Sequence, residues 1–533
     1  MKSNPFVYGR PLSPAEFVGR ELSLRQIFGW LVTDHPVAVV GQPRTGKTTL
    51  LNCIADDNIW KKITGDRLAS ALFCFLDAQT LRGVHTQAEF WERALSPLAK
   101  HLRIEHTHST RTTPERADFS EREFLIKLFK ILSNRFNQEE IRVLCFHLGI
   151  EYEDLQGEGK KDKTVSLIKQ LYRYNRINEF IDTGKSLRPD ITWEEYLVTT
   201  AGGLPKKILR STQPNVEGLY IKARENQFGA PFLEDLFKGM ALENLQLILL
   251  LDDFDDVLTH PVLNNAEFYG GLRSFASRLP ALGLVISTRR GLAQLNELTQ
   301  GFTGGSPYFN VFNEMHLGVL EENTIVFLLN QADDRFGKED QQFILEMSGR
   351  HPYLFQVAAA VLWDIHEVKL SGIQKYRKAC EAFYKQTRKH YNEIWNTWTN
   401  ETRKVAIISA LTQISCSYQI SATKEIKMFH DWSVYTPELI ESETIGLLSK
   451  KDEEKNGNRI ITQPAFLWWL AEELQRMRYS NIAFRDWLLA QRMDNLLTAQ
   501  EIQAMESAVI KTLELTKSGV SGLIDAFVRK LIG

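Results

Sequence analysis

The sequence predicts an α/β fold in which a doubly wound parallel sheet is combined with several all-helical parts. Four short apolar runs, three of them followed by polar residues, are separated by helical patterns, as in a parallel sheet. A glycine-rich segment stands between the first run and the next helical pattern. This order of strand, loop and helix favours an open sheet that binds a ligand at the carboxyl ends of its strands.

The expected strands share a fully apolar composition, which is typical of strands covered on both faces. They lie at residues 37–40, 72–76, 247–251 and 282–286. Polar residues follow the last three strands, namely Asp77, then Asp252 with Asp253, then Ser287 with Thr288. We therefore expect these side chains at one edge of the sheet.

Residues 41–48 fit the pattern G-x-x-x-x-G-K-[ST] of a phosphate-binding loop. The residues expected to bind the phosphates are Gly41, Gln42, Pro43, Arg44, Thr45, Gly46, Lys47, Thr48 and Thr49. Backbone N–H groups of such a loop wrap phosphates, and the dipole of the following helix favours their negative charge. Lys47 would contact the β- and γ-phosphates, and the Thr48 hydroxyl would hold Mg²⁺. The pattern thus predicts a P-loop NTPase sheet with ATP or ADP and Mg²⁺ as cofactors, and a glycine-rich turn without a ligand is the alternative.

The third strand ends in the acids that such a site requires. Asp252 would bind Mg²⁺, directly or through water, and Asp253 would polarise the attacking water. Many P-loop ATPases have Glu at the second position, and the shorter side chain of Asp253 favours slow hydrolysis. Paired Asp residues at a strand end can also be helix N-caps, a role that Asp255 and Asp256 fit better.

Ser287, Arg289 and Arg290 follow the fourth strand and are further candidates for catalysis. A hydroxyl at Ser287 would sense the γ-phosphate or the attacking water. Either arginine would stabilise developing negative charge, in its own site or in that of a neighbouring subunit. The alternative is a pair of surface arginines after a strand.

The remaining sequence predicts helical domains. Residues 78–246 separate the second strand from the third, far more than an α/β connection needs. Within them, residues 120–193 carry amphipathic helical stretches, and Asn137 with Glu140 has the spacing of a capping box. The predicted domains are two halves of an ATPase core at 1–119 and 194–310, the helical insert at 120–193, a helical lid at 311–400, a winged helix at 401–475 and a helical tail at 476–533. Strands are expected to stop after residue 310, except for the hairpin of the winged helix.

Two further segments resemble parts of the AAA+/STAND ATPases, the signal-transduction ATPases with numerous domains. Residues 4–9 (NPFVYG) and 16–21 (EFVGRE) resemble their N-terminal element, and residues 348–356 (SGRHPYLFQ) resemble the turn that opens a lid helix. The resemblance implies that Phe17, Val18, Gly19 and Pro352 line the pocket of the base, whereas a turn and a helix start are the alternatives. It also implies a winged helix that packs on the lid and holds the resting state.

The insert has a resemblance of its own. Residues 136–149, 152–155, 157–160 and 187–193 resemble bacterial effector-associated domains, which are small death-fold-like helical modules. The resemblance implies binding to like modules on effectors such as proteases and nucleases. Such modules usually stand at a terminus, so the internal position departs from the pattern, and an ordinary helical insertion is the alternative.

Composition and charge exclude several classes of protein. The 533 residues are 43% hydrophobic and 24% charged, the balance of a soluble globular protein. A net charge of -2 provides no global basic field for nucleic acid or for a membrane. Five cysteines without a CxxC pair argue against a disulfide framework and a structural zinc site. No apolar run could span a bilayer and the N-terminus has no signal-peptide core, so we expect a cytoplasmic protein without a membrane partner.

These observations favour a nucleotide-driven molecular switch of the STAND type that hydrolyses ATP slowly. Its nucleotide state would control assembly into a homo-oligomer, and the insert at 120–193 would bind an effector or sensor protein. The resemblance places such a switch in bacterial, including antiviral, defence or in stress signalling.

Two alternatives remain. A DNA-handling ATPase, similar to an initiator or a transposition regulator, would use the winged helix. Residues 450–455 at the wing tip balance three positive charges with three negative ones, which disfavours contact with phosphates. Trp468 and Trp469 are interpreted as core residues and not as a platform for bases. The second alternative is a scaffold that holds nucleotide and never hydrolyses it.

Overall fold

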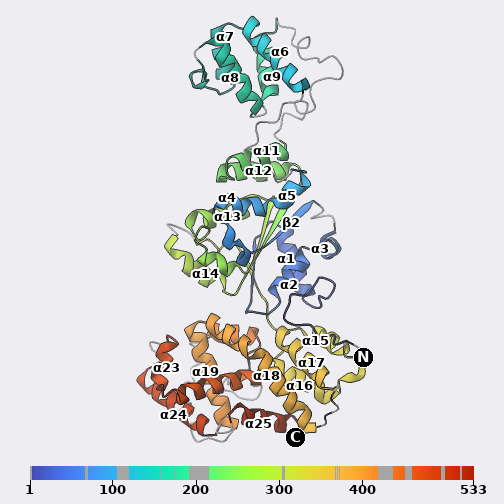
Figure 1. The fold of residues 1–533 in the computed structure, drawn as a ribbon, viewed down its shortest axis with the longest axis vertical. Helices are drawn as coiled ribbons and strands as arrows, with labels where there is room; N and C mark the ends of the chain where they lie inside the picture. Colours follow the sequence, from blue (N-terminus) through green and yellow to red (C-terminus); the bar gives the residue numbers. More distant parts are fainter. Residues whose placement is uncertain are drawn as a thin grey trace. The chain divides into compact units, whose positions relative to one another are not determined.

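The structure is a computed structural model (Figure 1). It divides into two compact units. It describes residues 3–65, 70–104, 119–157, 159–173, 176–190, 215–302, 307–366, 368, 370, 372–417, 436–450, 459–493, 498–515 and 519–532. One unit comprises Met1–Thr86, Ile248–Arg278 and Leu282–Gly533, and the other comprises Gln87–Leu247 with Leu279–Ala281. The finer domain bounds expected from the sequence stay predictions.

A five-stranded sheet is the centre of the first unit in the described part of the chain, and its strand order is β2-β3-β4-β1-β5. The strands are β1 (Val37–Val40), β2 (Ala71–Asp77), β3 (Gln246–Asp252), β4 (Leu282–Thr288) and β5 (Asn313–His316). Strand β1 pairs in parallel with β4 on one side and with β5 on the other. The predicted α/β fold with a parallel sheet is confirmed.

Strand β5 corrects the expectation that strands stop after residue 310. It pairs with β1 so that Asn313 lies opposite Val37 and His316 opposite Val40. Only Met315 of its four residues is buried, because β5 is the edge strand of the sheet. The sequence Asn-Glu-Met-His therefore lacks the apolar run by which buried strands are recognised.

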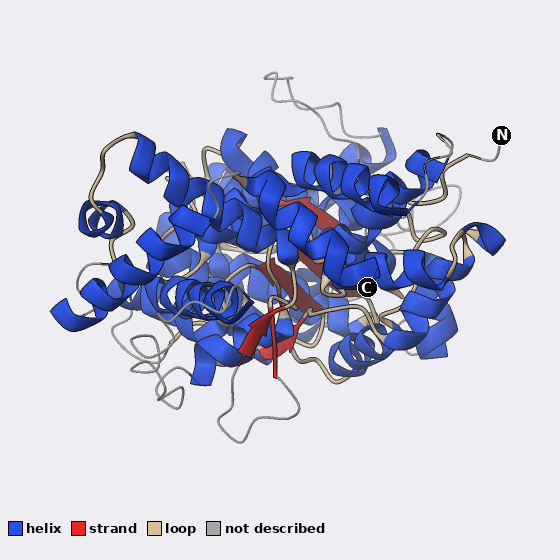
Figure 2. Ribbon diagram, turned by 90° about the horizontal axis from the view of Figure 1, so that it is seen from below, coloured by secondary structure: helices blue, strands red, loops and turns tan. Residues whose placement is uncertain are grey.

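The helices of the sheet unit pack on an apolar core that the strands supply. Helices α1 (Glu21–Val32), α2 (Lys47–Ile54) and α3 (Asp57–Thr64) pack with one another and share a core with β1 and with Ile248 and Leu250 of β3. The first unit also includes η2 (Ala78–Gly83), η4 (Phe254–Thr259), α13 (Ala266–Arg278), α14 (Leu292–Thr299) and η5 (Gln300–Phe302). Figure 2 shows how much of the chain is helical beside these few strands.

The second unit is helical, and the insert within it has a core of its own. Its elements are α4 (Gln87–Ala94), α5 (Ser96–His101), α6 (Phe119–Arg135), α7 (Gln138–His147), η3 (Tyr152–Asp154), α8 (Lys160–Arg173), α9 (Ile177–Leu187), α11 (Val216–Glu225) and α12 (Ala230–Leu242). Buried side chains of α6, α7, α8 and α9, among them Leu132, Leu144 and Phe180, form one cluster. The predicted capping box is present, since Asn137 Oδ1 accepts from the Glu140 N–H and Glu140 Oε2 accepts from the Asn137 N–H.

The lid, the winged helix and the tail belong to the first unit and share one continuous core. The lid consists of α15 (Glu322–Asn330), η6 (Asp333–Arg335), α16 (Lys338–Ser348), α17 (Pro352–His366) and α18 (Gly372–Thr397). The winged helix consists of α19 (Asn400–Ser417), α21 (Thr436–Thr444), β6 (Leu448–Lys450), β7 (Arg459–Ile461) and α22 (Pro464–Tyr479), and the tail of α23 (Phe484–Ala490), α24 (Ala499–Leu515) and α25 (Val520–Ile532). A single cluster of buried side chains extends from Phe6 and the lid through the winged helix to Val528.

The winged helix has the expected hairpin, and its two tryptophans lie in the core. Strands β6 and β7 pair antiparallel, with Leu448 opposite Ile461. Trp468 and Trp469 are each 2% exposed, so the interpretation as core residues is confirmed. The wing tip at 451–458 lies outside the described residues.

Two glycines hold the winged helix against the lid at van der Waals distance. Gly349 follows α16 with φ +55°, and Gly446 precedes β6 with φ +70°. A Cβ at Gly446 would lie 2.4 Å from the Gly349 carbonyl oxygen, and a Cβ at Gly349 would lie 2.5 Å from that of Gly446. Only glycine fits this contact at either position.

None of the helices in the described residues is both long enough and apolar enough to cross a membrane.

Candidate nucleotide-binding site

The loop between β1 and α2 has the backbone geometry of an anion site. The Gly41 N–H donates to the Thr288 carbonyl of β4 at 3.0 Å, which fixes the start of the loop to the sheet. A Cβ at Gly41 would lie 2.6 Å from Thr45 Oγ1, so the fold requires glycine there. Gly46 precedes α2 with φ +96° and has no side chain to cap the helix. The first N–H groups of α2 therefore face the loop, where an anion can bind them.

Lys47 is the buried cation of this loop. Its side chain is enclosed, and Nζ donates to the carbonyls of Gly41 at 2.9 Å and Gln42 at 3.3 Å. Burial lowers the pKa of Lys47, and the carboxylates of Asp253, Asp255 and Asp252 oppose that change. A buried ammonium bonded only to neutral carbonyls is stabilised further when an anion enters the loop.

The acids after β3 and the hydroxyl after β4 form one hydrogen-bonded group. Ser287 Oγ donates to Asp252 Oδ1 and accepts from the Asp253 N–H at 3.0 Å. Asp252 is 3% exposed and Ser287 is fully buried. The expectation that these strand ends meet at one edge of the sheet is thus met for three of the predicted site residues, although their roles stay predictions.

Asp253 has the environment of a proton acceptor. Burial raises its pKa, the charge of Asp252 raises it further, and Lys47 and Arg289 act in the opposite direction. Asp253 adopts a left-handed conformation with φ +48°. Its Oδ2 accepts from Gln79 Nε2 at 2.9 Å. Gln79 lies in η2, directly after β2. No local pattern predicts this contact, because 174 positions separate the two residues.

Arg289 and Arg290 are held by a third acid, and the N-cap interpretation of Asp255 is wrong. Asp255 lies inside η4, and its carboxylate accepts from the Arg289 N–H at 2.7 Å and from Arg290 Nη1 at 2.6 Å. The N-cap position of η4 belongs to Asp253, which makes no side-chain cap bond. The buried Asp255 therefore orients the guanidinium of Arg290 and the backbone of Arg289. The charge of Arg289 acts on Lys47 and Asp253.

The residues expected around the base come from two elements. Phe17 packs on the core of α1 and β1, and Gly19 approaches α15 so closely that a Cβ would lie 2.3 Å from Thr324 Oγ1. Val18 is half-buried between them, and Pro352 is the first residue of α17. The Thr49 hydroxyl of α2 accepts from the Leu12 N–H at 3.2 Å, which joins the N-terminal segment to the loop helix. Pro43 and Thr48 are half-buried in the loop.

Side chains of the loop are bonded to the lid and to the winged helix, in a set of contacts that we call the loop clasp. Arg44 Nη2 lies 3.0 Å from Glu393 Oε1 of α18, and its guanidinium stacks 4.5 Å from the Tyr353 ring centroid. Gln42 Nε2 donates to Glu441 Oε1 of α21 at 3.0 Å. The hydroxyl of Thr397 in α18 donates to Gln42 Oε1 at 3.0 Å. Sequence reasoning missed the clasp, because its partners lie about 350 to 400 positions apart.

Two buried histidines lie next to Tyr353, the ring on which Arg44 of the loop clasp stacks. The rings of His351 and His390 are 5.1 Å apart, and neither ring nitrogen of His351 has a hydrogen-bond partner among the described residues. Burial, followed by the charges of Arg20 and Arg44, lowers the pKa of His351 to about 3. Burial also lowers the pKa of His390, and the charges of His351 and Arg44 lower it further. Both imidazoles are therefore neutral wherever this part of the chain stays closed.

This pair predicts a loss of stability in mild acid. Unfolded histidines take up protons below their ordinary pKa of 6.5, whereas the buried rings do not. The stability that the pair contributes is therefore complete above that pH. As the pH decreases below it, the free energy of unfolding falls by up to about 1.4 kcal/mol per pH unit for each proton. We expect His351→Gln to make the free energy of unfolding less dependent on pH between about 5 and 6.5. Denaturant unfolding followed by tryptophan fluorescence measures this slope.

The exposed His101 of α5 provides the matched control. His101→Gln should leave the slope of the unfolding free energy against pH unchanged. A slope that is equal in the wild type and in His351→Gln would show that the His351 ring is not buried in the folded chain.

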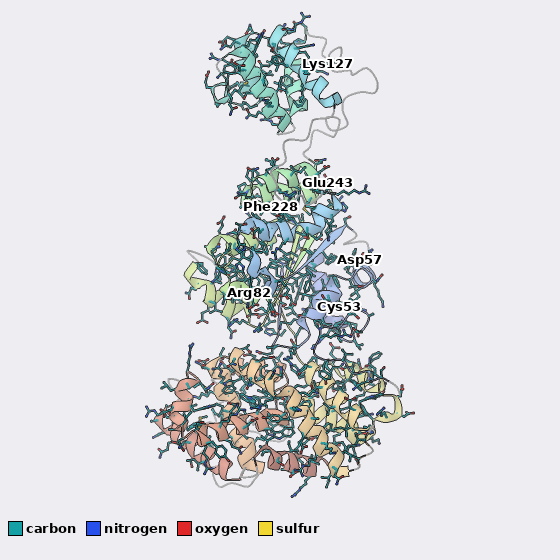
Figure 3. The ribbon with its side chains drawn as sticks, in the orientation of Figure 1. Cys53, Asp57, Arg82, Lys127, Phe228 and Glu243 are labelled. Atoms are coloured by element: carbon teal, nitrogen blue, oxygen red, sulfur yellow. The ribbon has the colours of Figure 1, made fainter. Side chains whose placement is uncertain are left out.

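The residues at the loop fit a nucleotide with Mg²⁺. The Asp252 carboxylate and the Thr48 hydroxyl offer the oxygen ligands that Mg²⁺ prefers, and the ion commonly completes its shell with phosphate oxygens and water. Figure 3 shows the side chains of α2, including the labelled Cys53, on the helix that follows the loop. Among the described residues, no group of three or more His, Cys, Asp and Glu side chains is arranged to hold a metal ion by itself.

Comparison with known proteins identifies the inserted domain. Residues 125–189 match the model of the family described as Effector-associated domain 7. No curated protein matches the chain.

Similar solved structures include the Walker-type ATPase of Pyrococcus abyssi, with 11% identity, a TM-score of 0.40 and coverage of 86% of this chain and 98% of that one. Cdc6p from Pyrobaculum aerophilum matches with 13% identity, a TM-score of 0.31 and coverage of 87% and 97%. The Aeropyrum pernix Orc1 protein, solved in complex with DNA, matches with 9% identity, a TM-score of 0.31 and coverage of 87% and 94%. The fold is assigned from the strand order of the sheet and from the loop at residues 41–48. The chain thus combines a P-loop ATPase fold with an effector-associated domain.

Proposed function

We propose that this P-loop ATPase with its effector-associated domain is a molecular switch of the STAND type. It binds ATP and Mg²⁺, hydrolyses ATP slowly, and couples its nucleotide state to self-assembly and to recruitment of an effector. The observation that carries the proposal is the loop clasp, because the residues that would bind phosphate are also bonded to the lid and the winged helix.

The clasp gives the nucleotide a means to change the conformation. A ligand shifts an equilibrium only as far as its affinities for the two states differ. Phosphate groups that draw the loop toward them change the positions of Gln42 and Arg44, and with them the bonds to Glu441 and Glu393. Each such bond contributes about 0.5 to 1.5 kcal/mol, so a few of them match the differential affinity of a nucleotide.

The residues after β3 and β4 supply the hydrolytic step. Mg²⁺, when bound, neutralises charge on the phosphates. Lys47 and the N–H groups at the start of α2 would bind and orient the phosphate oxygens, and Asp252 and Thr48 would hold the ion. Asp253 accepts a proton from the attacking water at a carboxylate whose pKa is raised by burial and by Asp252. The bond from Gln79 occupies one oxygen of Asp253, which favours slow turnover in this conformation.

The effector-associated domain supplies the output of the switch. By its family resemblance, it would bind a like module on an effector or sensor protein. Bacterial defence or stress signalling is the setting that the resemblance implies. The open form would assemble with further copies of the chain.

Releasing the clasp tests this proposal. Glu441 accepts from both Gln42 and Thr402, and it is half-buried. Loss of these bonds costs about 1 to 3 kcal/mol, so Glu441→Ala should shift the closed-to-open equilibrium about 5- to 150-fold toward the open, assembled form. Mass measurement in solution with ADP and with ATP detects the shift as assembly at lower ATP.

Glu381→Ala, on the exposed face of α18, is the matched control and should behave as the wild type. Identical masses for Glu441→Ala and wild type with both nucleotides would contradict the switch.

A DNA-handling ATPase is the second candidate, and the winged helix is the observation that favours it. Binding of duplex DNA that weakens steeply with salt would support this function. The same mass measurement with DNA present separates the two candidates, because the switch requires no DNA for assembly.

A further inference from the structure

Helix α7 of the effector-associated domain exposes apolar side chains that its own core does not use. We call Glu139, Val143 and Phe146 the α7 strip, since steps of four and three residues place them on one helix face. Val143 is 46% exposed and Phe146 is 81% exposed. The buried side chains of the same helix are Ile141, Leu144 and Cys145. The helix therefore has a second apolar face in addition to the one that packs inside the domain.

The side chain of Phe146 packs against little of its own domain. Among the described residues its ring contacts only that of His147, its neighbour in the chain, at 6.1 Å between centroids. Water contact of this extent is unfavourable for a phenyl ring, and exposed aromatic side chains are enriched where proteins bind one another. The strip is therefore suited to a protein partner.

Helix α8 exposes a second strip with the opposite charge. We call Lys161, Val165 and Lys169 the α8 strip, and its members are four residues apart on one face. Val165 is 38% exposed, and both lysines are exposed. Within the part of the chain that the structure describes, neither ammonium group has an ion-pair partner. The opposite face carries Thr164, Leu167 and Ile168, which are buried in the domain.

The two strips differ in the charges that border them. Element η3 packs against α7, the exposed Glu151 directly precedes it and the exposed Glu153 lies within it. Arg142 lies 3.3 Å from Glu139 and 3.0 Å from Glu153, which also contacts Lys163, so Glu151 remains as an additional acid. The α8 strip has two lysines around its apolar centre, and the exposed Asp162 beside Lys161 offsets only one of these two charges. An apolar strip with an acidic border and one with a basic border are complementary.

We propose that the α7 strip of one copy of this chain packs on the α8 strip of a second copy. Val143 and Phe146 would cover Val165, and Glu139 would face Lys161 or Lys169. The contact joins two different surfaces, so a pair of copies keeps one free α7 strip and one free α8 strip, and further copies can add in the same way. This inference deepens the proposed switch and rests on it for its timing, but the contact itself depends only on the strips.

Replacement of Phe146 tests the contact in the full chain. Phe146→Asp places a charge in the apolar centre and should raise the concentration needed for self-association at least about tenfold. Light scattering after size-exclusion chromatography measures the mass without nucleotide, with ADP and with ATP. Circular dichroism should show no loss of helix, because the side chain is exposed. Tyr479→Asp, at an aromatic residue that is 86% exposed on α22, is the matched control and should assemble as the wild type.

A charge exchange identifies the second strip. Glu139→Lys and Lys161→Glu should each weaken self-association, whereas a mixture of the two variants, or both changes in one chain, should restore it. Restoration requires that these two residues meet across the interface, and loss of fold cannot produce it.

The possible results separate this inference from the proposed switch. A wild type that stays monomeric in all three nucleotide conditions overturns the inference, and so does assembly that Phe146→Asp leaves unchanged. If Phe146→Asp instead alters protease sensitivity of a monomeric chain, the α7 strip packs within the chain and the proposal is wrong. Assembly that depends on Phe146 but responds neither to ATP nor to Lys47→Ala supports the contact and contradicts the switch.

Discussion

Replacement of Lys47 with alanine is expected to weaken ATP binding by about 30-fold to several thousand-fold. The variant removes the buried ammonium that would face the β- and γ-phosphates. Loss of one partner of a buried, hydrogen-bonded charge pair costs about 2 to 5 kcal/mol, and each 1.4 kcal/mol corresponds to a factor of about ten. Titration calorimetry with ATP and Mg²⁺ measures the dissociation constant directly.

Lys61→Ala provides the control, since Lys61 is an exposed lysine of α3 that pairs with Asp57 at 3.5 Å. Its ATP affinity should equal that of the wild type. Equal affinity in Lys47→Ala as well would place the nucleotide outside the loop at 41–48 and would remove the basis of the proposed function.

Asp253→Asn is expected to slow ATP hydrolysis by about 100- to 10,000-fold while ATP still binds. The amide cannot accept a proton from water, yet it keeps the size of the carboxylate and can still accept from Gln79. Single-turnover hydrolysis, compared with the ATP dissociation constant, separates the chemical step from binding.

Asp256→Asn serves as the neighbouring control, because Asp256 lies one turn further in η4 beside Asp255. It should hydrolyse ATP at the wild-type rate. A wild type that binds ATP and never hydrolyses it would instead support the scaffold function, and Asp253→Asn would then change nothing measurable.

The sheet and the loop could be predicted from sequence because their signals are local. A buried parallel strand such as β1 needs apolar residues on both faces. The loop needs glycine at position 46 for its positive φ and at position 41 because a Cβ there would meet the Thr45 hydroxyl. The capping box of α7 is local as well, since Asn137 and Glu140 are three residues apart. Each of these features is contained within a few consecutive residues.

The features that the sequence did not predict depend on distant partners. Strand β5 is stabilised by its pairing with β1, and its polar residues carry no strand signal of their own. Gln79 reaches Asp253 only because β2 and β3 are neighbours in the sheet. Asp255 looked like an N-cap because the sequence could not show Arg290 on the next strand end. The clasp partners Glu393 and Glu441 lie in helices whose placement no local pattern encodes.

The continuous core of lid, winged helix and tail has a mechanical consequence. A block that shares one interior cannot bend at its internal boundaries without opening that interior to water. In the proposed switch, residues 317–320, where Leu317 is bonded to Val40 of the sheet and Leu320 to Arg350 of the lid, would act as the pivot. A small rotation there would displace each part of the block in proportion to its distance from the pivot. Small adjustments around a phosphate would thereby become large displacements at the far end of the block.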